Sequence, residues 1–342
     1  MGKKEILANL LRETGLLAIM RRVPRPAKDH DHLRILAYHR ICDVPDESTF
    51  PFDPELISAS TSDFREQMRH VAAHFVPVSC ADVMAALDGT QALPKRAVVV
   101  TFDDGHLDNY TQAFPVLKAL GIPATIFLST AYVGEPGTFW FDQVANILFR
   151  APASSHTLPG SEQPVALGNT ESRRDALKNV LRYLKKIPDA RRREVIAELA
   201  ATLTPATTNN DSSLSGVVTW PQVREMASAR IEFGSHGVSH PVLTQLEDSV
   251  LERELVESRA VLEAQLGRPV ETIAYPDGGL QAFDARVVEA VKRAGYRLGL
   301  SYISGTNHLH HMDRFALHRL HVERYTSRAW FEAMLELPRL FK

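Results

Sequence analysis

The chain has 342 residues and nearly balanced charges, with 39 lysines and arginines against 41 aspartates and glutamates and a formal net charge of -2. So small a net charge argues against a nucleic-acid-binding protein, which needs a strong positive field, and 44% apolar residues exclude a disordered chain. The two cysteines, Cys42 and Cys80, are too few for a disulfide framework and form no Cys-x-x-Cys pair, so we expect a reducing compartment.

The first 34 residues predict a short amphipathic helix followed by a basic segment. The apolar positions of the helix are Ile6, Leu7, Leu10, Leu11, Leu17 and Met20, and the basic residues after it are Arg21, Arg22, Arg25 and Lys28. Residues 1–34 carry 8 lysines and arginines against 4 acidic residues. Two interpretations stay open: a helix that braces the domain surface, and a helix that lies on an anionic membrane face.

The same segment bears on localisation. Glu5, Arg12 and Glu13 interrupt the apolar stretch that a signal peptide requires. No apolar run reaches the ~18 residues of a transmembrane helix. We therefore expect a cytoplasmic protein that is peripheral to the inner face of the membrane if its N-terminal helix contacts lipid.

From residue 33 onward, β-branched runs alternate with helical segments, which is typical of a parallel sheet wrapped by helices. The predicted strands cover residues 34–38, 97–102, 124–128, 231–235, 271–275 and 296–301. Apolar residues at helical spacing predict helices over 64–75 and 251–266, and Gly267 would end the second. This order predicts an α/β fold, either a TIM-like barrel or an open doubly wound sheet.

Residues from about 138 to 216 read as an insertion into this pattern. Residues 151–170 and 201–216 are rich in Ser, Thr, Pro, Gly and Asn and flank a charged helical stretch over 171–203, so we expect a surface insertion with flexible ends. The predicted organisation is an N-terminal helix and linker over 1–32 and one domain over 33–342. Residues 171–200 carry 9 basic against 5 acidic residues, either a solvated helix face or a binding surface for an anionic lipid or sugar phosphate.

Two adjacent carboxylates end one of the predicted strands. Asp103, Asp104 and Gly105 follow the strand at 97–102. Ligands of α/β folds bind at the carboxyl ends of strands, which favours a functional site. Asp-Asp-Gly also suits a turn that caps the next helix, and these residues alone leave both interpretations open.

Two histidines follow the strand at 231–235. His236 and His240 are four residues apart, a spacing that lets two imidazoles on one helical turn bind one metal ion. Gly237 stands where the His-Glu-x-x-His motif carries its base, so the base must come from elsewhere. One aspartate of the Asp103–Asp104 pair can complete a three-ligand site with an open position, and the other can take a proton from water. Two imidazole ligands favour Zn²⁺ over magnesium or calcium.

Two further strand ends carry candidate site residues. Tyr275, Pro276 and Asp277 precede Gly278, and a Pro-x-Gly turn presents backbone N–H groups that can stabilise an oxyanion. His39 follows the strand at 34–38 and would lie at the same rim, either in the site or as a structural histidine.

Three motifs in chain order resemble the polysaccharide deacetylases of the NodB-homology type, also called carbohydrate esterase family 4. They are Thr-Phe-Asp-Asp-Gly (101–105), Ser-His-x-x-x-His (235–240) and Tyr-Pro-x-Gly (275–278), and the resemblance extends from residue 33 to about 323. It implies a distorted, TIM-like (β/α) barrel with an incomplete set of strands. It also implies a divalent metal, usually zinc, with Asp104, His236 and His240 as ligands, Asp103 as catalytic base and the backbone N–H of Asp277 in the oxyanion site.

The chain departs from the family's pattern in its third, fourth and fifth motifs. Ala274 stands where the family usually has an arginine that orients the base, and Arg319 is the candidate replacement. No counterpart of the fourth motif is found. The histidine that protonates the leaving amine has two counterparts, His318 and His321. Side chains alternate along a strand, so His321 would share a face with Arg319, and we prefer it.

The sequence thus predicts a metal-dependent hydrolase that removes acetyl groups from N-acetylated amino sugars of a surface polysaccharide or its lipid-linked precursor. The alternatives are an O-deacetylase or other amide hydrolase on the same fold, and a non-catalytic glycan-binding module. Retention of both aspartates and both histidines weighs against the module. Trp140 and Trp220 have apolar neighbours, and we expect them in the core rather than in the site.

Overall fold

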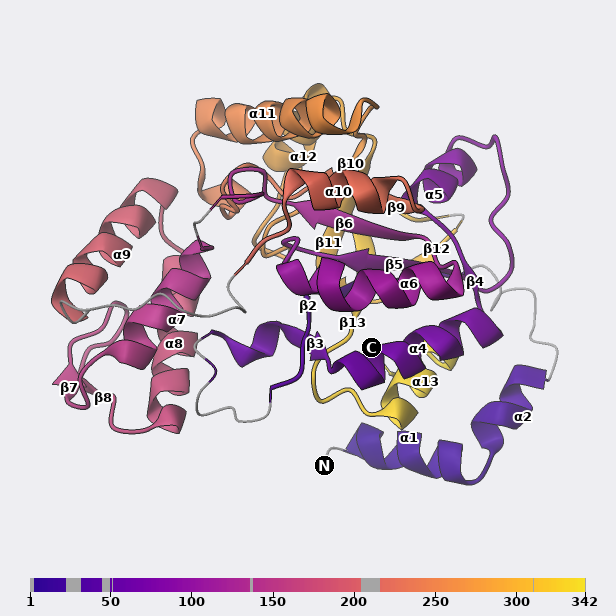
Figure 1. Ribbon diagram of the computed structural model, residues 1–342, viewed down its shortest axis with the longest axis horizontal. Helices are drawn as coiled ribbons and strands as arrows, with labels where there is room; N and C mark the ends of the chain where they lie inside the picture. The colour runs from indigo at the N-terminus through magenta and orange to yellow at the C-terminus, as the bar shows by residue number, and fades with distance from the viewer. Residues whose placement is uncertain are drawn as a thin grey trace.

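A computed structural model of the chain describes residues 3–22, 32–44, 50, 52–135, 138–203, 216–309 and 311–341. Its centre is a closed barrel of seven parallel strands (Figure 1). Around the barrel the strands are β1 (His32–Tyr38), β13 (Leu317–His321), β11 (Leu298–Ser304), β10 (Thr272–Ala274), β9 (Ile231–Ser235), β6 (Ala124–Leu128) and β5 (Ala97–Phe102). β5 pairs back with β1, which excludes the open sheet and confirms a TIM-like barrel with fewer than eight strands.

The strands of the barrel are buried on both faces, as their continuous apolar sequences predict. On β5, Val98 and Val100 pack in the cluster formed with the outer helices, whereas Val99 packs in the cluster of the barrel interior. Because successive side chains of a strand point to opposite sides, both faces of β5 must be apolar.

Helices cover the outside of the barrel. They are α4 (Thr61–His74), α5 (Cys80–Leu87), α6 (Phe114–Leu120), α10 (Trp220–Ala227), α11 (Asp248–Leu266), α12 (Ala285–Arg293) and α13 (Arg328–Glu336). The two helices predicted from spacing are α4 and α11. The Ser60 side chain caps α4 by accepting the N–H of Asp63, and α11 ends at Gly267, which has a φ of 66°.

Short elements complete the barrel's surroundings. They are β2 (Arg40–Ile41), η2 (Pro54–Leu56), β3 (Ile57–Ala59), β4 (Val76–Pro77), a π-helical turn η3 (Asn109–Ala113), η4 (Leu243–Gln245) and β12 (Asn307–His308). η2 lies near the carboxyl ends of the barrel strands, where Glu55 and Leu56 contribute to the site described below.

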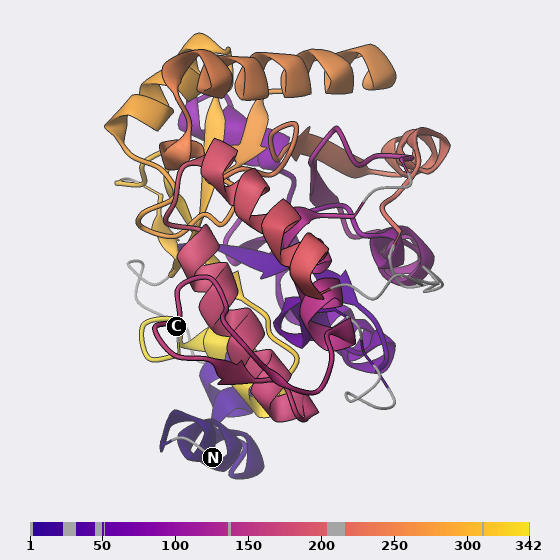
Figure 2. The same ribbon diagram turned by 90° about the vertical axis from the view of Figure 1, so that its left-hand side faces the viewer.

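The insertion forms a helical layer on one side of the barrel, at the left of Figure 1 and toward the viewer in Figure 2. Its elements are α7 (Trp140–Arg150), β7 (Ser155–His156), β8 (Val165–Ala166), α8 (Thr170–Leu184) and α9 (Asp189–Leu203). Residues 151–170, predicted as one of the flexible ends of the insertion, contain β7 and β8, which pair as an antiparallel hairpin. The charged stretch is two helices rather than one, and residues 204–215 lie outside the described part. The domain boundaries stay a prediction.

The N-terminal segment also differs from the single helix that the sequence predicts. It forms α1 (Lys3–Glu13) and α2 (Leu16–Arg22), which separate at Gly15 with a φ of 71°. α1 lies against α13 (Figure 1), where the Ser327 hydroxyl donates to the Glu5 carboxylate. None of the described helices has both the length and the apolarity to cross a bilayer. Arg25 and Lys28 of the basic run fall outside the described residues.

Candidate active site

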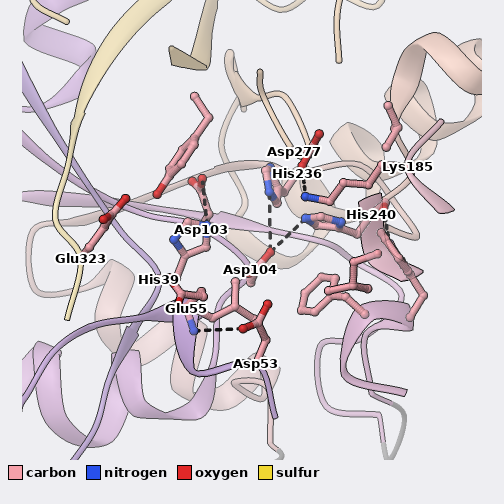
Figure 3. A pocket seen from close by; sticks show the side chains of 16 residues that line it. His39, Asp53, Glu55, Asp103, Asp104, Lys185, His236, His240, Asp277 and Glu323 are labelled. Carbon is pink, nitrogen blue, oxygen red and sulfur yellow. Dashed lines mark hydrogen bonds and ion pairs between the residues drawn. The ribbon is translucent and has the colours of Figure 1, made fainter. Parts of the chain in front are cut away.

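The two aspartates after β5 diverge at a turn of left-handed backbone. Asp104 has a φ of 71° and Gly105 a φ of 75°. A Cβ on Gly105 would lie 2.2 Å from the Leu128 side chain, so only glycine fits here. The turn directs Asp103 toward Arg319 of β13. It directs Asp104 toward His236 and His240 in the loop after β9, as Figure 3 shows.

Asp104, His236 and His240 form the only cluster of three His, Cys, Asp or Glu side chains with metal-binding distances among the described residues. Asp104 Oδ1 lies 3.2 Å from His240 Nε2 and 3.6 Å from His236 Nε2. All three side chains are buried. The spacing predicted that the two histidines share a helical turn, and they do not. They lie on a loop with left-handed backbone at Gly237 (φ 78°) and at His240 (φ 55°).

Residues around this loop fix the direction of the His236 imidazole and the path of the backbone that leads to His240. His236 Nδ1 is 2.8 Å from the Ala274 carbonyl, which can only accept, so Nδ1 donates and Nε2 is left with its lone pair toward Asp104. Glu254, buried on α11, accepts the backbone N–H groups of Val238 at 2.6 Å and Ser239 at 3.0 Å. Glu254 belongs to no motif, and its part in the site was not predicted.

The donor set fits a divalent cation. Asp104 Oδ1 and His240 Nδ1 are buried, with no hydrogen-bond partner among the described residues. Burial lowers the pKa of His236 to about 4, so its imidazole is neutral at pH 7. Burial raises the pKa of Asp104, but His106 and His240 outweigh it and hold that pKa well below the ordinary value. A carboxylate and neutral imidazoles are the forms that bind a metal ion.

Asp103 is held by a buried arginine from β13, which is separated from β5 by β1 alone. Arg319 on β13 is fully buried, and its guanidinium donates to both carboxylate oxygens of Asp103, at 2.8 and 2.7 Å. It also donates to the Ser301 carbonyl at 2.7 Å. Burial raises the pKa of Asp103, but the charge of Arg319 reverses the effect and leaves the pKa below its usual value. The structure thus brings Arg319 to the position that an orienting arginine would need.

The two histidines near the end of β13 lie in different surroundings. The His321 ring stacks on the Tyr302 ring, with centroids 3.7 Å apart. The Arg319 guanidinium lies 5.3 Å from the centroid of the Tyr302 ring. Burial, and then the charge of Arg319, lower the pKa of His321 to about 4. His318 instead lies beside Gly305, away from this group. Tyr302 lines the cavity described below, whereas His321 lies behind it.

The Tyr275-Pro276-Asp277 segment is only partly in the site, which corrects the prediction. Tyr275 is fully buried, donates its hydroxyl to the Phe315 carbonyl at 2.7 Å and stacks on Phe283, so it supports the fold rather than the substrate. Pro276 is buried and does not line the cavity. Asp277 does line it, has a φ of 64°, and pairs through its side chain with Lys185 of the insertion.

These residues surround one cavity of about 330 Å³ (Figure 3). The predicted residues that line it are His39, Asp103, Asp104, His236, His240 and Asp277. The lining residues that the sequence did not indicate are Asp53, Glu55, Leu56, Trp140, Phe141, Leu181, Lys185, Val242, Tyr302 and Glu323. His39 Nε2 lies 3.9 Å from Asp103 Oδ2. Most of the missed residues come from η2 and the insertion, whose approach to the barrel leaves no local signal.

The insertion supports the metal-binding cluster directly. Trp140 donates its indole N–H to the His240 carbonyl at 3.0 Å, and the ring of Phe141 lies 5.2 Å from the His240 ring. The expectation that Trp140 belongs only to the core is therefore wrong. Trp220 packs against the core, as expected.

A second cavity of about 430 Å³ continues from the first along α8, and the two share Asp53, Glu55, Leu181 and Lys185. Arg174, Lys178 and Arg182 of the basic run line this second cavity, with Asp175 beside them. The run is therefore in part a groove wall with mixed charge, and its role in holding an anionic ligand stays a prediction.

Curated proteins with related sequences are deacetylases by name. The chain is 38% identical over 108 residues to the poly-beta-1,6-N-acetyl-D-glucosamine N-deacetylase of Escherichia coli strain K12, a match that covers 31% of this chain and only 15% of that protein. It is 22% identical over 242 residues to the putative polysaccharide deacetylase YxkH of Bacillus subtilis strain 168, covering 71% of this chain and 57% of that protein.

Solved structures share the fold. The Streptococcus pyogenes deacetylase PplD matches with a TM-score of 0.59 and 20% identity over 91% of this chain and 98% of that one. IcaB from Ammonifex degensii matches with a TM-score of 0.56 and 19% identity over 90% and 97% of the two chains. The family model described as "Polysaccharide deacetylase" matches residues 90–299, a span that includes the turn after β5 and the loop after β9. The chain belongs to the polysaccharide deacetylase family.

Proposed function

We propose that this protein is a metal-dependent hydrolase that removes acetyl groups from N-acetylated amino sugars of a polysaccharide or of its precursor. The observation that carries the proposal is the pairing, in one cavity, of a buried three-ligand cluster with a second carboxylate held by Arg319. The names of the Escherichia coli and Staphylococcus aureus relatives support an N-acetylglucosamine polymer as the substrate class.

Asp104, His236 and His240 would hold the metal, and two imidazole ligands favour Zn²⁺ over magnesium or calcium. The ion would supply Lewis acidity toward the acetyl carbonyl and the attacking water. Asp103 would take a proton from that water. Arg319 keeps Asp103 in the ionised form and fixes its direction, so that a base is ready at neutral pH. The backbone N–H of Asp277 is the proposed donor to the oxyanion.

Collapse of the tetrahedral species breaks the C–N bond, and the amine needs a proton as it leaves. His321 is the proposed donor. Its ring is neutral at pH 7 in the free protein, so it would have to gain a proton when substrate binds. The proton that Asp103 takes from water is a second source, and His39, which lines the cavity beside Asp103, is a third.

A lipid-linked precursor near a membrane is the proposed form of the substrate. The exposed apolar side chains of α1 and α2 support a protein that works close to lipid. The location of the protein in the cytoplasm stays a prediction.

Acetate release tests the reaction directly. The purified protein, with its metal content measured, is incubated with N-acetylated and O-acetylated glycan oligomers, with and without a chelator. We expect acetate from the N-acetylated substrate, loss of activity with the chelator, and recovery on adding Zn²⁺. Release from O-acetylated substrate alone would assign an O-deacetylase. A protein that binds the oligomers and releases no acetate in any metal-loaded form would be the glycan-binding module.

A further inference from the structure

The two N-terminal helices present a group of exposed apolar side chains, which we name the N-terminal apolar face. It consists of Ile6, Leu7 and Leu10 on α1 and Leu16 and Ile19 on α2, each 40–55% exposed. Eleven large apolar side chains are exposed in the described part of the chain, and these five fall within residues 6–19. Scattered exposed apolar residues are ordinary, but a cluster of this kind marks an interaction surface.

The N-terminal apolar face is fixed to the body of the protein. Ala8 and Leu17, on the other side of the same helices, are buried in the main core. Glu5 accepts a hydrogen bond from Ser327, and Arg12 lies 3.5 Å from Glu332 of α13. On a helix, residues 6, 7 and 10 fall within about 100° of arc, so α1 points one face inward and another outward. The outward face is therefore presented in a defined direction.

The charge beside this face selects its occupant. Among the described residues, α1 begins with Lys3 and Lys4, and α2 ends with Arg21 and Arg22. Apolar side chains next to a basic segment are the pattern of a helix that lies in the interface of an anionic bilayer. A second copy of the chain would fit less well, because a two-fold contact would bring the basic helix ends of the two copies together.

An exposed aromatic side chain, Tyr325, lies close in sequence to the residue that contacts α1. Tyr325 is 66% exposed and precedes, by two residues, the Ser327 that bonds to α1. The Arg324 guanidinium lies 4.9 Å from the Tyr325 ring. Tyrosine and arginine are typical of the boundary between headgroups and acyl chains.

We propose that the N-terminal apolar face docks on an anionic lipid bilayer, with α1 and α2 lying in the plane of the interface. The apolar side chains enter the boundary between headgroups and acyl chains, and the basic ends of α1 and α2 lie at the anionic headgroups. The docking itself is independent of hydrolysis. Its consequence, that the cavity works on glycans carried at the membrane, rests on the proposed function.

Vesicle flotation with the full chain tests the docking. Wild type is mixed with phosphatidylcholine vesicles with or without phosphatidylglycerol, and we expect it to float with the anionic vesicles and to be released by salt. The double variant Ile6→Asp/Leu10→Asp should partition at least about tenfold less. Val256→Asp/Val261→Asp is the matched control: it changes two exposed aliphatic residues on α11 and should float like wild type.

Two further measurements keep the outcomes distinct. Light scattering reports the oligomeric state: a wild-type dimer that the Ile6→Asp/Leu10→Asp variant converts to monomer would show that a second copy covers the face, and the proposal would be wrong. It would equally be wrong if folded wild type stayed with the soluble fraction, or if both double variants floated alike. Acetate release from a soluble oligomer should be the same in all three proteins, so failure of the docking is separable from failure of the proposed reaction.

Discussion

The Arg319 guanidinium forms two parallel hydrogen bonds with the Asp103 carboxylate, joining residues 216 positions apart in the chain across the strand β1 that separates β5 from β13. Both groups are buried, so the pair is shielded from solvent and rigid. A carboxylate held in this way can act as a base without first finding its orientation. The adjacent Asp104 faces the two histidines, so the turn at these two residues points the proposed base and the proposed metal ligand in different directions.

Asp103→Asn should strongly reduce turnover while leaving the metal bound. The amide keeps the shape of the side chain but cannot take a proton, so we expect kcat to fall by about 10²–10⁴-fold. Metal content by mass spectrometry should match wild type. Asp104→Asn is the paired variant and should lose metal as well as turnover. Full activity of Asp103→Asn would contradict the assignment of the base.

Arg319→Lys should show that turnover needs the two-bond geometry between Arg319 and Asp103 and not the positive charge alone. A lysine cannot donate to both oxygens of Asp103 from one planar group, so the base loses its fixed direction. We expect a lower kcat with little change in KM. Arg319→Ala leaves a buried carboxylate without its cation and should lower the free energy of unfolding by about 3–5 kcal/mol in urea. Unchanged turnover in a folded Arg319→Ala protein would remove Arg319 from the mechanism.

The stability of the protein should fall as the pH drops from about 6.5 to about 4. The folded-state pKa of His321 is lowered to about 4, while the unfolded chain has a value near 6.5, so the unfolded state binds the proton first. Because the buried ring stays neutral, the free energy of unfolding decreases below pH 6.5, by at most about 3 kcal/mol. His321→Gln should therefore lose less stability than wild type between pH 7.5 and 5 in urea unfolding without metal. Parallel curves for the two proteins would be inconsistent with this pKa.

His106 should contribute to metal affinity although it is not a proposed ligand. It is buried, and its Nε2 lies 3.3 Å from Asp104 Oδ2, the oxygen that faces away from His240. From this position its ring limits the rotation of the carboxylate. We expect His106→Phe to weaken metal binding by about 10–100-fold in competition with a chromogenic chelator. Circular dichroism checks folding, and wild-type affinity in a folded variant would contradict the assignment.

Lys185→Met should affect substrate handling more than stability. The Lys185–Asp277 pair links the insertion to the turn that carries the proposed oxyanion donor, and both side chains are partly exposed. Exposed pairs contribute only about 0–1 kcal/mol, so the melting temperature should change little. KM or kcat should change several-fold. Lys186→Met, at the exposed next position, is the control and should behave as wild type in both assays.

The strands could be predicted closely because buried parallel strands are short, continuous apolar runs with clear ends. The predictions for 97–102, 124–128 and 231–235 coincide with β5, β6 and β9. The cluster of Asp104, His236 and His240 could be predicted because each residue stands at a strand end within a motif. Periodicity was less informative where the backbone is irregular, as in the loop that carries His236 and His240.

What the sequence did not indicate depends on contacts between distant segments. Glu254 looks like any charged residue of a surface helix, yet it is buried under the histidine loop. Trp140 has the apolar neighbours of a core residue, and its place in the cavity follows from how the insertion meets the barrel. Tyr275 lies in a motif but faces the core, because a tight turn directs neighbouring side chains to different sides.

The contact between Trp140 and the His240 backbone means that the insertion cannot be trimmed away to leave a minimal catalytic barrel. Removing it would take one wall from the cavity and expose the loop that carries His240. On α8, Leu181 lines the cavity as part of the insertion, whereas Asp103 and Asp104 follow β5 of the barrel. The chain therefore keeps its reactive groups and much of its substrate-contacting wall in separate stretches. Exchange of residues on α8 is then a route to new glycan preferences that leaves the reaction itself intact.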